Sequence, residues 1–276
     1  MLVACSGIFV IAIALILGFL AFNGTKLFWS DHVSLFTFLF SSDWDGENGH
    51  FGAAAFIAGS LVATAMAILI GGPLGVAIGV FFSELAPKRV ATAFKPAIEV
   101  LVGIPSVVYG WLGLTLLVPA IATVFHMPDG DSLFAAGIVL SIMILPTVIS
   151  LSEDALSVVP NSMREGSAAL GATRFETIVR VLIPAASSGL AVAIILGVAR
   201  AIGETLAVQL VLGNAAIFPT SLFQPAAALT SEIVMEMGNA PDGSPWKHAL
   251  FSMAFLLLLI SMGLIVLIRL ALRRRT

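Results

Sequence analysis

Charge is scarce in this sequence of 276 residues. Asp, Glu, Lys and Arg together make up 11% of it, less than half of the roughly 25% found in a typical soluble domain. Hydrophobic residues make up 59%, and the mean hydropathy is +1.08. A soluble globular enzyme, a disordered chain and a nucleic-acid binder are excluded, because these classes need a charged or basic surface. The formal net charge of -3 indicates no strongly charged partner.

Cysteine and the common catalytic motifs are also missing. Cys5 is the only cysteine, which excludes a disulfide framework and a cysteine-based metal site. The four histidines lie outside the apolar runs or at their ends, and neither Gly-x-Ser-x-Gly nor His-Glu-x-x-His occurs. A Gly-x-x-x-x-Gly-Lys-Ser/Thr phosphate loop is absent too. The sequence therefore predicts no metal site, no membrane enzyme and no ATP site in this chain.

Long apolar runs are what the sequence does contain. A bilayer core of about 30 Å needs about 20 apolar residues per helix. Six runs meet that length: Leu2–Phe22, Phe51–Phe82, Ala97–Phe125, Ser132–Leu151, Ser188–Leu212 and Ala249–Leu270. We therefore expect one all-α integral membrane domain over residues 1–276, with six spans.

The first run could be a signal peptide, because it lies at the N-terminus. It has no basic residues before it, and its apolar part is too long for a typical signal sequence, so we expect a retained helix. The lack of any basic residue before Lys26 leaves open a longer native N-terminus.

The basic residues fix the expected orientation. Ten of the 13 lie in the two connections Ser83–Pro96 and Ser152–Ser187 or in the C-terminal tail. These ten are Lys88, Arg89, Lys95, Arg164, Arg174, Arg180, Arg269, Arg273, Arg274 and Arg275. The opposite connections hold only Lys26 and Lys247 and are rich in Asp and Glu. The positive-inside rule then places both termini in the cytoplasm.

Small residues and a break mark two of the spans. In the second span, small residues recur every four positions, at Gly59, Ala63, Ala67, Gly71, Gly75 and Gly79. Such a stripe lets another helix approach closely, and ordinary helix packing explains it. The third span is interrupted by Gly103-Ile104-Pro105-Ser106, where we expect a kink or a short unwound turn.

Arg200 and Glu204 are the residues of the spans that most need explaining. Arg200 lies near the centre of the fifth span, where an insertion scale assigns an arginine about 2.5–3.5 kcal/mol. Glu204, four residues on, is expected on the same helix face. One interpretation is a structural ion pair between helices. The other is a substrate pathway in which the guanidinium attracts an anion and the carboxylate accepts a hydrogen bond from a protonated oxyanion, which favours phosphate over sulfate.

The connection Ser152–Ser187 predicts a helix–turn–helix at the membrane surface. Its first part is helix-prone up to Gly171, a residue suited to ending a helix or taking a left-handed turn. After it, Phe175, Ile178, Val179 and Leu182 recur at helical spacing. Periodicity alone indicates only an interfacial loop.

This connection resembles the EAA loop of ABC importer permeases, whose pattern is Glu-Ala-Ala, three residues, Gly, nine residues and Ile-x-Leu-Pro. Glu165, Gly171 and Pro184 stand at the required spacings, and Gly166 and Ser167 replace the two alanines. The resemblance implies the six-helix type I ABC importer fold (MetI-like). It also implies that Glu165, Gly171, Ala172 and Arg174 belong to a coupling helix that docks onto an ATPase.

Three further segments resemble the permeases of phosphate importers. They are Phe82-Ser83-Glu84-Leu85-Ala86-Pro87, Gly103-Ile104-Pro105-Ser106-Val107-Val108-Tyr109-Gly110 and Arg200-Ala201-Ile202-Gly203-Glu204-Thr205-Leu206-Ala207-Val208. The stretch that follows, to Asn214, is closer to the PstC-type than to the PstA-type subunit. The resemblance implies that Arg200, Glu204 and Thr205 lie on the phosphate pathway. For Pro105, Ser106 and Tyr109 it implies a place in the pathway or at a kink.

The resemblance also implies partners. These are a second, PstA-type permease subunit, two copies of a cytoplasmic ATPase that hold ATP and magnesium, an extracytoplasmic phosphate-binding protein, and inorganic phosphate. The expected location is the lipid bilayer of a bacterial or archaeal cell membrane, with no cofactor in this chain and no nucleic acid. The alternative is an ion-coupled secondary transporter or channel that uses Arg200 and Glu204.

Overall fold

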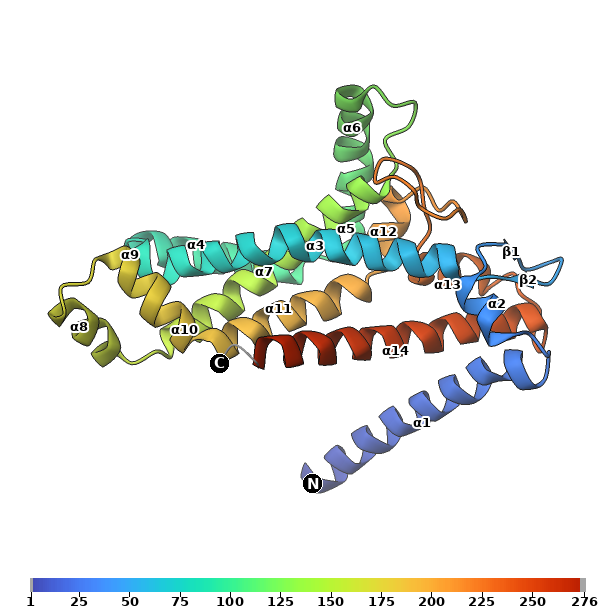
Figure 1. Ribbon diagram of the computed structural model, residues 1–276, viewed down its shortest axis with the longest axis horizontal. Helices are drawn as coiled ribbons and strands as arrows, with labels where there is room; N and C mark the ends of the chain where they lie inside the picture. The colour runs from blue at the N-terminus through green and yellow to red at the C-terminus, as the bar shows by residue number, and fades with distance from the viewer. Residues whose placement is uncertain (1, 274–276) are drawn as a thin grey trace.

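Long helices dominate the architecture of the computed structural model, which describes residues 2–273 (Figure 1). The long helices are α1 (Leu2–Trp29), α3 (Ala54–Val80), α7 (Leu133–Ser157), α11 (Ser187–Ile202) and α14 (Pro245–Arg273). The shorter ones are α2 (Leu35–Phe40), α4 (Lys88–Gly103), α5 (Ser106–Leu112), α6 (Val118–Phe125), α8 (Asn161–Ala169), α9 (Arg174–Thr177), α10 (Ile183–Ala185), α12 (Leu206–Val211) and α13 (Leu229–Glu236). Arg274 and Arg275, counted above for the orientation, lie outside the described residues.

Short irregular elements join these helices. Three π-helical turns, η1 (Phe81–Leu85), η2 (Gly113–Leu117) and η3 (Ile178–Leu182), continue neighbouring α-helices. A two-residue antiparallel ladder pairs β1 (Trp44–Asp45) with β2 (His50–Phe51). The ladder, α2 and α13 gather at one end of the molecule, and α8 and α9 lie at the other end (Figure 1).

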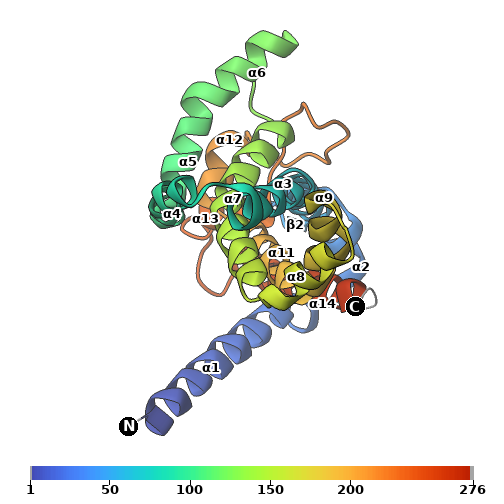
Figure 2. The same ribbon diagram turned by 90° about the vertical axis from the view of Figure 1, so that its left-hand side faces the viewer.

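Helices α3, α7, α11 and α14 run side by side, and α1 contacts α14 and then diverges from the bundle (Figures 1 and 2). Within residues 2–273, five helices are long and apolar enough to cross a membrane. A sixth span is obtained when the segments Arg174–Ala185 and Ser187–Ile202, bent by 72°, are counted as one. The expected all-α membrane fold is confirmed, and the count of six depends on that bent pair.

Two predicted spans are wrong in their bounds. The third begins at Ser106 rather than at Ala97, because α4 is a separate amphipathic helix that ends at Gly103. Pro105 disfavours a helical conformation at the residue before it, and Ile104 is extended, with ψ of 129°. Beyond this break, α5 and α6 turn away from the bundle (Figures 1 and 2). The fifth span, predicted to reach Leu212, ends at Ile202.

The close packing of α3 against α7 follows from the stripe of small residues. A Cβ atom added at Gly75 would lie 2.8 Å from Val148, and one at Gly79 would lie 2.6 Å from Ser152. At Gly71 the same atom would lie 2.9 Å from Ile144. Because only a hydrogen atom fits at these positions, the two backbones approach closely along three turns. The prediction of a tight helix contact is confirmed.

Candidate functional site

Arg200 lies in the last turn of α11 and reaches across to α7. Its Nη1 donates a hydrogen bond of 3.0 Å to the Thr147 hydroxyl. Among the described residues the guanidinium forms no ion pair. A neutral hydroxyl accepts a hydrogen bond but does not balance the charge, and most of the five guanidinium N–H donors stay available. The bundle therefore holds a positive charge that no side chain of residues 2–273 neutralises.

Glu204 does not share a helix with Arg200, contrary to the sequence-based prediction. Helix α11 ends at Ile202, and Gly203 caps it. The Thr230 hydroxyl donates to the Glu204 carbonyl oxygen at 2.9 Å, and the Glu204 carboxylate accepts from the Ala207 N–H at 3.3 Å. In a continuous helix the Glu204 carbonyl oxygen and the Ala207 N–H would hydrogen-bond to other backbone groups. Here both are bonded to side chains, and the backbone turns after α11. The structural ion pair considered above is not formed.

A very small polar cavity adjoins Glu204. Its volume is about 10 Å³, and its lining includes Ser60, Thr64, Glu204 and Thr230. The volume is at the lower limit for one water molecule, so no oxyanion fits in this conformation. Sequence reasoning missed Thr147, Ser60, Thr64 and Thr230. For Thr147, Ser60 and Thr64 the available signal was a hydroxyl residue inside an otherwise apolar run, and Thr230 lies outside the runs.

The residues predicted at the break of the third span lie together. Pro105 caps α5 and Ser106 is its first residue. The Tyr109 hydroxyl donates to the Leu101 carbonyl at 2.8 Å and so bridges the break. Tyr109 belongs to the same buried apolar cluster as Ala201 and Ala207, on either side of Glu204. Its hydroxyl is close enough to Arg200 for an electrostatic interaction. The predicted kink is confirmed.

Thr205 stands between α11 and α12 and precedes the first residue of α12. Its hydroxyl contacts the Gly203 carbonyl at 3.5 Å, which is a marginal distance for a hydrogen bond. Thr205 thus helps to form the turn after Arg200, together with Glu204.

The predicted helix–turn–helix is confirmed at α8 and α9. Gly171 has φ of +81°, the left-handed conformation expected of it. The Ser167 and Thr177 hydroxyls hydrogen-bond at 2.9 Å and join the two helices. Thr173 and Glu176 form a reciprocal capping box that starts α9.

The outer face of this helix–turn–helix is exposed. Glu165 and Arg174 both point their side chains into solvent, and Ala172 is half-buried. Leu170 is 90% exposed and Phe175 is 73% exposed. Exposed apolar side chains grouped in this way mark a contact surface for another protein or for lipid.

Arg164 anchors α8 to the bundle. Its Nη2 and Nε donate to the two Glu84 carboxylate oxygens at 2.6 and 3.2 Å. The hydrogen bonds with Glu84 raise the pKa of Arg164 above its usual range. The guanidinium therefore stays charged at any pH at which the protein is folded.

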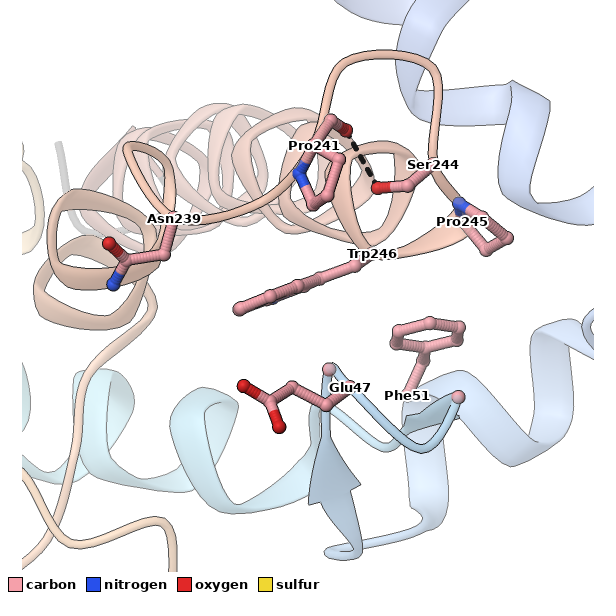
Figure 3. Close-up of a pocket in the computed structure, with 9 residues that line it drawn as sticks. Glu47, Phe51, Asn239, Pro241, Ser244, Pro245 and Trp246 are labelled. Atoms are coloured by element: carbon pink, nitrogen blue, oxygen red, sulfur yellow. Dashed lines mark hydrogen bonds between the residues drawn. The ribbon is translucent and has the colours of Figure 1, made fainter.

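An open pocket of about 540 Å³ lies at the opposite end of the molecule (Figure 3). The connection before α3 contributes Glu47 and Phe51, the connection before α14 contributes Asn239 and Pro241, and α14 itself contributes Trp246. Trp44 and Trp246 both donate their indole N–H to the same Glu236 oxygen, at 3.0 and 2.8 Å. The two long connections of the predicted outer side therefore form one surface.

Comparison with known sequences places the chain among transport proteins. Residues 71–275 match the family model described as "Binding-protein-dependent transport system inner membrane component". The probable ABC transporter permease protein YqgH of Bacillus subtilis (strain 168) is 46% identical over 99% of this chain and 89% of the relative. The phosphate transport system permease protein PstC of Haemophilus influenzae is 35% identical over 85% of this chain and 80% of the relative.

Solved structures share the fold. A bacterial alginate ABC transporter, solved with an alginate pentasaccharide-bound periplasmic protein, contains a chain with a TM-score of 0.63. That match is 13% identical and covers 97% of this chain and 94% of the other. An inward-facing structure of the methionine transporter MetNI gives a TM-score of 0.62 at 18% identity, over 80% of this chain and 96% of the other. The predicted MetI-like fold is confirmed.

Proposed function

Because this chain belongs to the family of binding-protein-dependent transport system inner membrane components, and is thus an ABC transporter permease subunit rather than an enzyme, we propose that its substrate is inorganic phosphate. Several relatives named as phosphate permeases are 31–35% identical over most of the chain, which supports this substrate. The chain would form one half of the transmembrane pathway.

The unpaired charge of Arg200 carries the proposal. A guanidinium inside a helix bundle, held by the neutral Thr147 and by no carboxylate, attracts an anion and offers it several donors in a fixed plane. Glu204, just beyond the end of α11, would accept a hydrogen bond from the protonated oxygen of hydrogen phosphate. Sulfate has no such proton at neutral pH and would be repelled. Thr205, directly after Glu204, would line the same turn.

The transport cycle would be alternating access. An extracytoplasmic phosphate-binding protein would dock on the surface formed by the two long outer connections (Figure 3). Two copies of a cytoplasmic ATPase, which hold ATP and magnesium, would close on each other and push against α8 and α9 of this chain. A second permease subunit of the PstA type would supply the other half of the pathway.

The orientation follows from the charges. The basic α4, α8 and α9 lie at the end of the molecule opposite to β1, β2 and α13 (Figure 1), and the basic end would face the cytoplasm. Both termini would then be cytoplasmic, in a bacterial or archaeal cell membrane. Glu165, Gly171, Ala172 and Arg174 would form the contact with the ATPase.

Substrate selectivity in reconstituted vesicles tests the proposal. The chain would be assembled with its partner subunits and binding protein in vesicles. Uptake of radiolabelled phosphate would be measured with ATP on the side of the membrane that carries the ATPase. We expect excess unlabelled phosphate to abolish the uptake and excess sulfate to leave it unchanged. Equal inhibition by sulfate, or transport of sulfate in place of phosphate, would contradict the proposal.

A further inference from the structure

We propose that Arg164 and Glu84 form the joint through which movement of α8 reaches the helix pair α3–α7. Arg164 lies on α8, and Glu84 lies in η1, the π-helical end of α3. The inference rests on the proposed function in one respect, because it takes α8 to be the segment that the ATPase moves. It goes beyond that function by assigning the residues that transmit the movement.

The Arg164 guanidinium contacts three elements at once. It holds both oxygens of Glu84, at 2.6 and 3.2 Å. Its Nη2 also donates to the Leu156 carbonyl in α7 at 3.2 Å, and its Nη1 donates to the Val159 carbonyl just after α7 at 2.7 Å. A planar group held on two edges is fixed in orientation as well as in position. Rotation of α8 is therefore passed on to the ends of both α3 and α7.

The burial of the pair explains why it would stay intact during movement. The Glu84 side chain is 10% exposed and the Arg164 side chain is 26% exposed. The Ser83 hydroxyl donates a further hydrogen bond to Glu84 at 3.1 Å. Separating the two charges would leave a carboxylate shielded from water without its partner, which is costly. The surface pair Arg180–Glu176 differs, because Arg180 is 78% exposed and the N–O distance is 3.6 Å.

Helix α7 connects this joint to Arg200. Thr147, which accepts the Arg200 hydrogen bond, lies nine residues before Leu156 on the same helix, about 13.5 Å at 1.5 Å per residue. Along that stretch α3 and α7 are in contact at Gly75 and Gly79, without room for a methyl group. Helices packed this tightly move as one body. Displacement of α8 would therefore shift Thr147 relative to Arg200.

Two variants and one control test the joint in the assembled complex. Glu84→Gln removes the charge but keeps an acceptor oxygen, and Arg164→Lys keeps the charge but cannot hold both Glu84 oxygens and the two carbonyls. Arg180→Gln is the control, because it breaks only a surface pair. We expect the first two variants to assemble and hydrolyse ATP while the ATP consumed per phosphate imported rises about tenfold, within the usual range of coupling energies. The control should keep the wild-type ratio.

A distance measurement separates this inference from the proposed substrate. Spin labels at Leu170→Cys, beyond α8, and Ile142→Cys, on α7, would be introduced with Cys5→Ser and cysteine-free partner subunits. Both sites are exposed. We expect ATP to leave the distance between the labels unchanged in the otherwise native chain and to change it in Glu84→Gln.

The outcomes do not overlap. The proposed role of Arg164 and Glu84 would be contradicted if ATP left the distance unchanged in Glu84→Gln as well. It would also be contradicted if both variants consumed as much ATP per imported phosphate as the wild type. If the complex imported no phosphate at all, the proposed function would fail, and the distance measurement would still decide whether α8 and α7 move together through Arg164.

Discussion

Arg200 is a charge whose position needs a functional reason. It lies inside the bundle, hydrogen-bonded to Thr147 and without an ion pair among the described residues. Charged residues at membrane depth are costly and face a partner, a cavity or a pathway. Because none of the residues that the structure describes supplies a countercharge, the counterion is expected to be the transported anion.

Replacing Arg200 separates the pathway role from a structural role. We expect Arg200→Ala to abolish phosphate uptake while the complex still assembles, since the guanidinium makes one neutral side-chain contact in this chain. Thr147→Val, the matched control, should only weaken uptake, because it removes the hydroxyl and leaves the charge. Uptake would be measured beside the yield of assembled complex. Failure of Arg200→Ala to assemble would favour a structural role.

The buried Glu232 in α13 is expected to make the stability of the protein depend on pH. It is 5% exposed, and burial followed by repulsion from Glu236 raises its pKa to about 8. The folded state therefore favours the protonated form, and its stabilisation is complete below pH 4.5 and is lost as the pH rises towards 8. We expect the melting temperature of the purified chain, followed by tryptophan fluorescence, to fall as the pH rises from 4.5 to about 8 and to level off above that.

Glu232→Gln should flatten this pH dependence, because the amide imitates the protonated carboxyl. The control Glu47→Gln changes an exposed carboxylate on the same face and should keep the wild-type profile. A Glu232→Gln variant with the wild-type pH dependence would show that another group causes it.

Single residues were predicted well from the sequence where a local rule applies. Gly171 was expected in a left-handed turn and is found there. The pairing of Arg200 with Glu204 was wrong, because the end of α11 depends on the Thr230 hydroxyl, 26 residues from Glu204. Local spacing carries no information on such a contact. Thr147, which does accept a hydrogen bond from Arg200, is 53 residues away in the sequence, so local spacing could not predict this contact either.

At the scale of elements, the contact between α3 and α7 organises the bundle. These two helices share the most extensive contact between any two elements described, and the glycines of α3 permit it. Because lipid tails provide no hydrophobic driving force, such close packing is what holds membrane helices together.

Enlarging one of these glycines should therefore weaken the bundle. Gly75→Leu would place its first carbon 2.8 Å from Val148, which requires the helices to separate, and overpacking of this kind costs about 1–3 kcal/mol. We expect a lower melting temperature in detergent. Gly18→Ala is the matched control, because nothing lies within 4 Å of the added carbon. An unchanged melting temperature for Gly75→Leu would contradict the packing argument.

The turn between α8 and α9 gives a second prediction at this scale. Gly171→Ala places a Cβ atom in a left-handed conformation, at a cost of about 1 kcal/mol, and changes the direction of α9. We expect ATP hydrolysis by the complex to continue while phosphate uptake falls. Gly166→Ala, in the middle of α8 where nothing crowds the new methyl group, should be neutral. Coupled transport in Gly171→Ala would argue against a docking role for this turn.

Hydropathy predicted the existence of the long helices but not all of their ends. The break at Gly103-Ile104-Pro105-Ser106 was expected, yet the second half of α4, from Ala97 to Gly103, was assigned to the span. Its apolar residues continue the hydrophobic run, and only its amphipathic pattern distinguishes it. The bend of 72° between Arg174–Ala185 and Ser187–Ile202 was not predicted, although Pro184 lies two residues before it.

At the scale of the whole molecule, the few charges divide the protein into two functional ends. Arg164, Arg174 and Arg180 belong to the end that would contact the ATPase, and Glu47, Glu232 and Glu236 belong to the end that would meet the binding protein. Arg200 lies between them. This distribution fits a permease that takes up an anion at the end facing the binding protein and is moved by the ATPase at the other end.

The dependence of uptake on ATP tests the central claim most directly. Vesicles that contain this chain, its partner subunits and the binding protein would be given radiolabelled phosphate, with or without ATP at the ATPase. We expect phosphate to accumulate only when ATP is present, and we expect no transport by this chain alone. Accumulation without ATP, or by this chain alone, would contradict it.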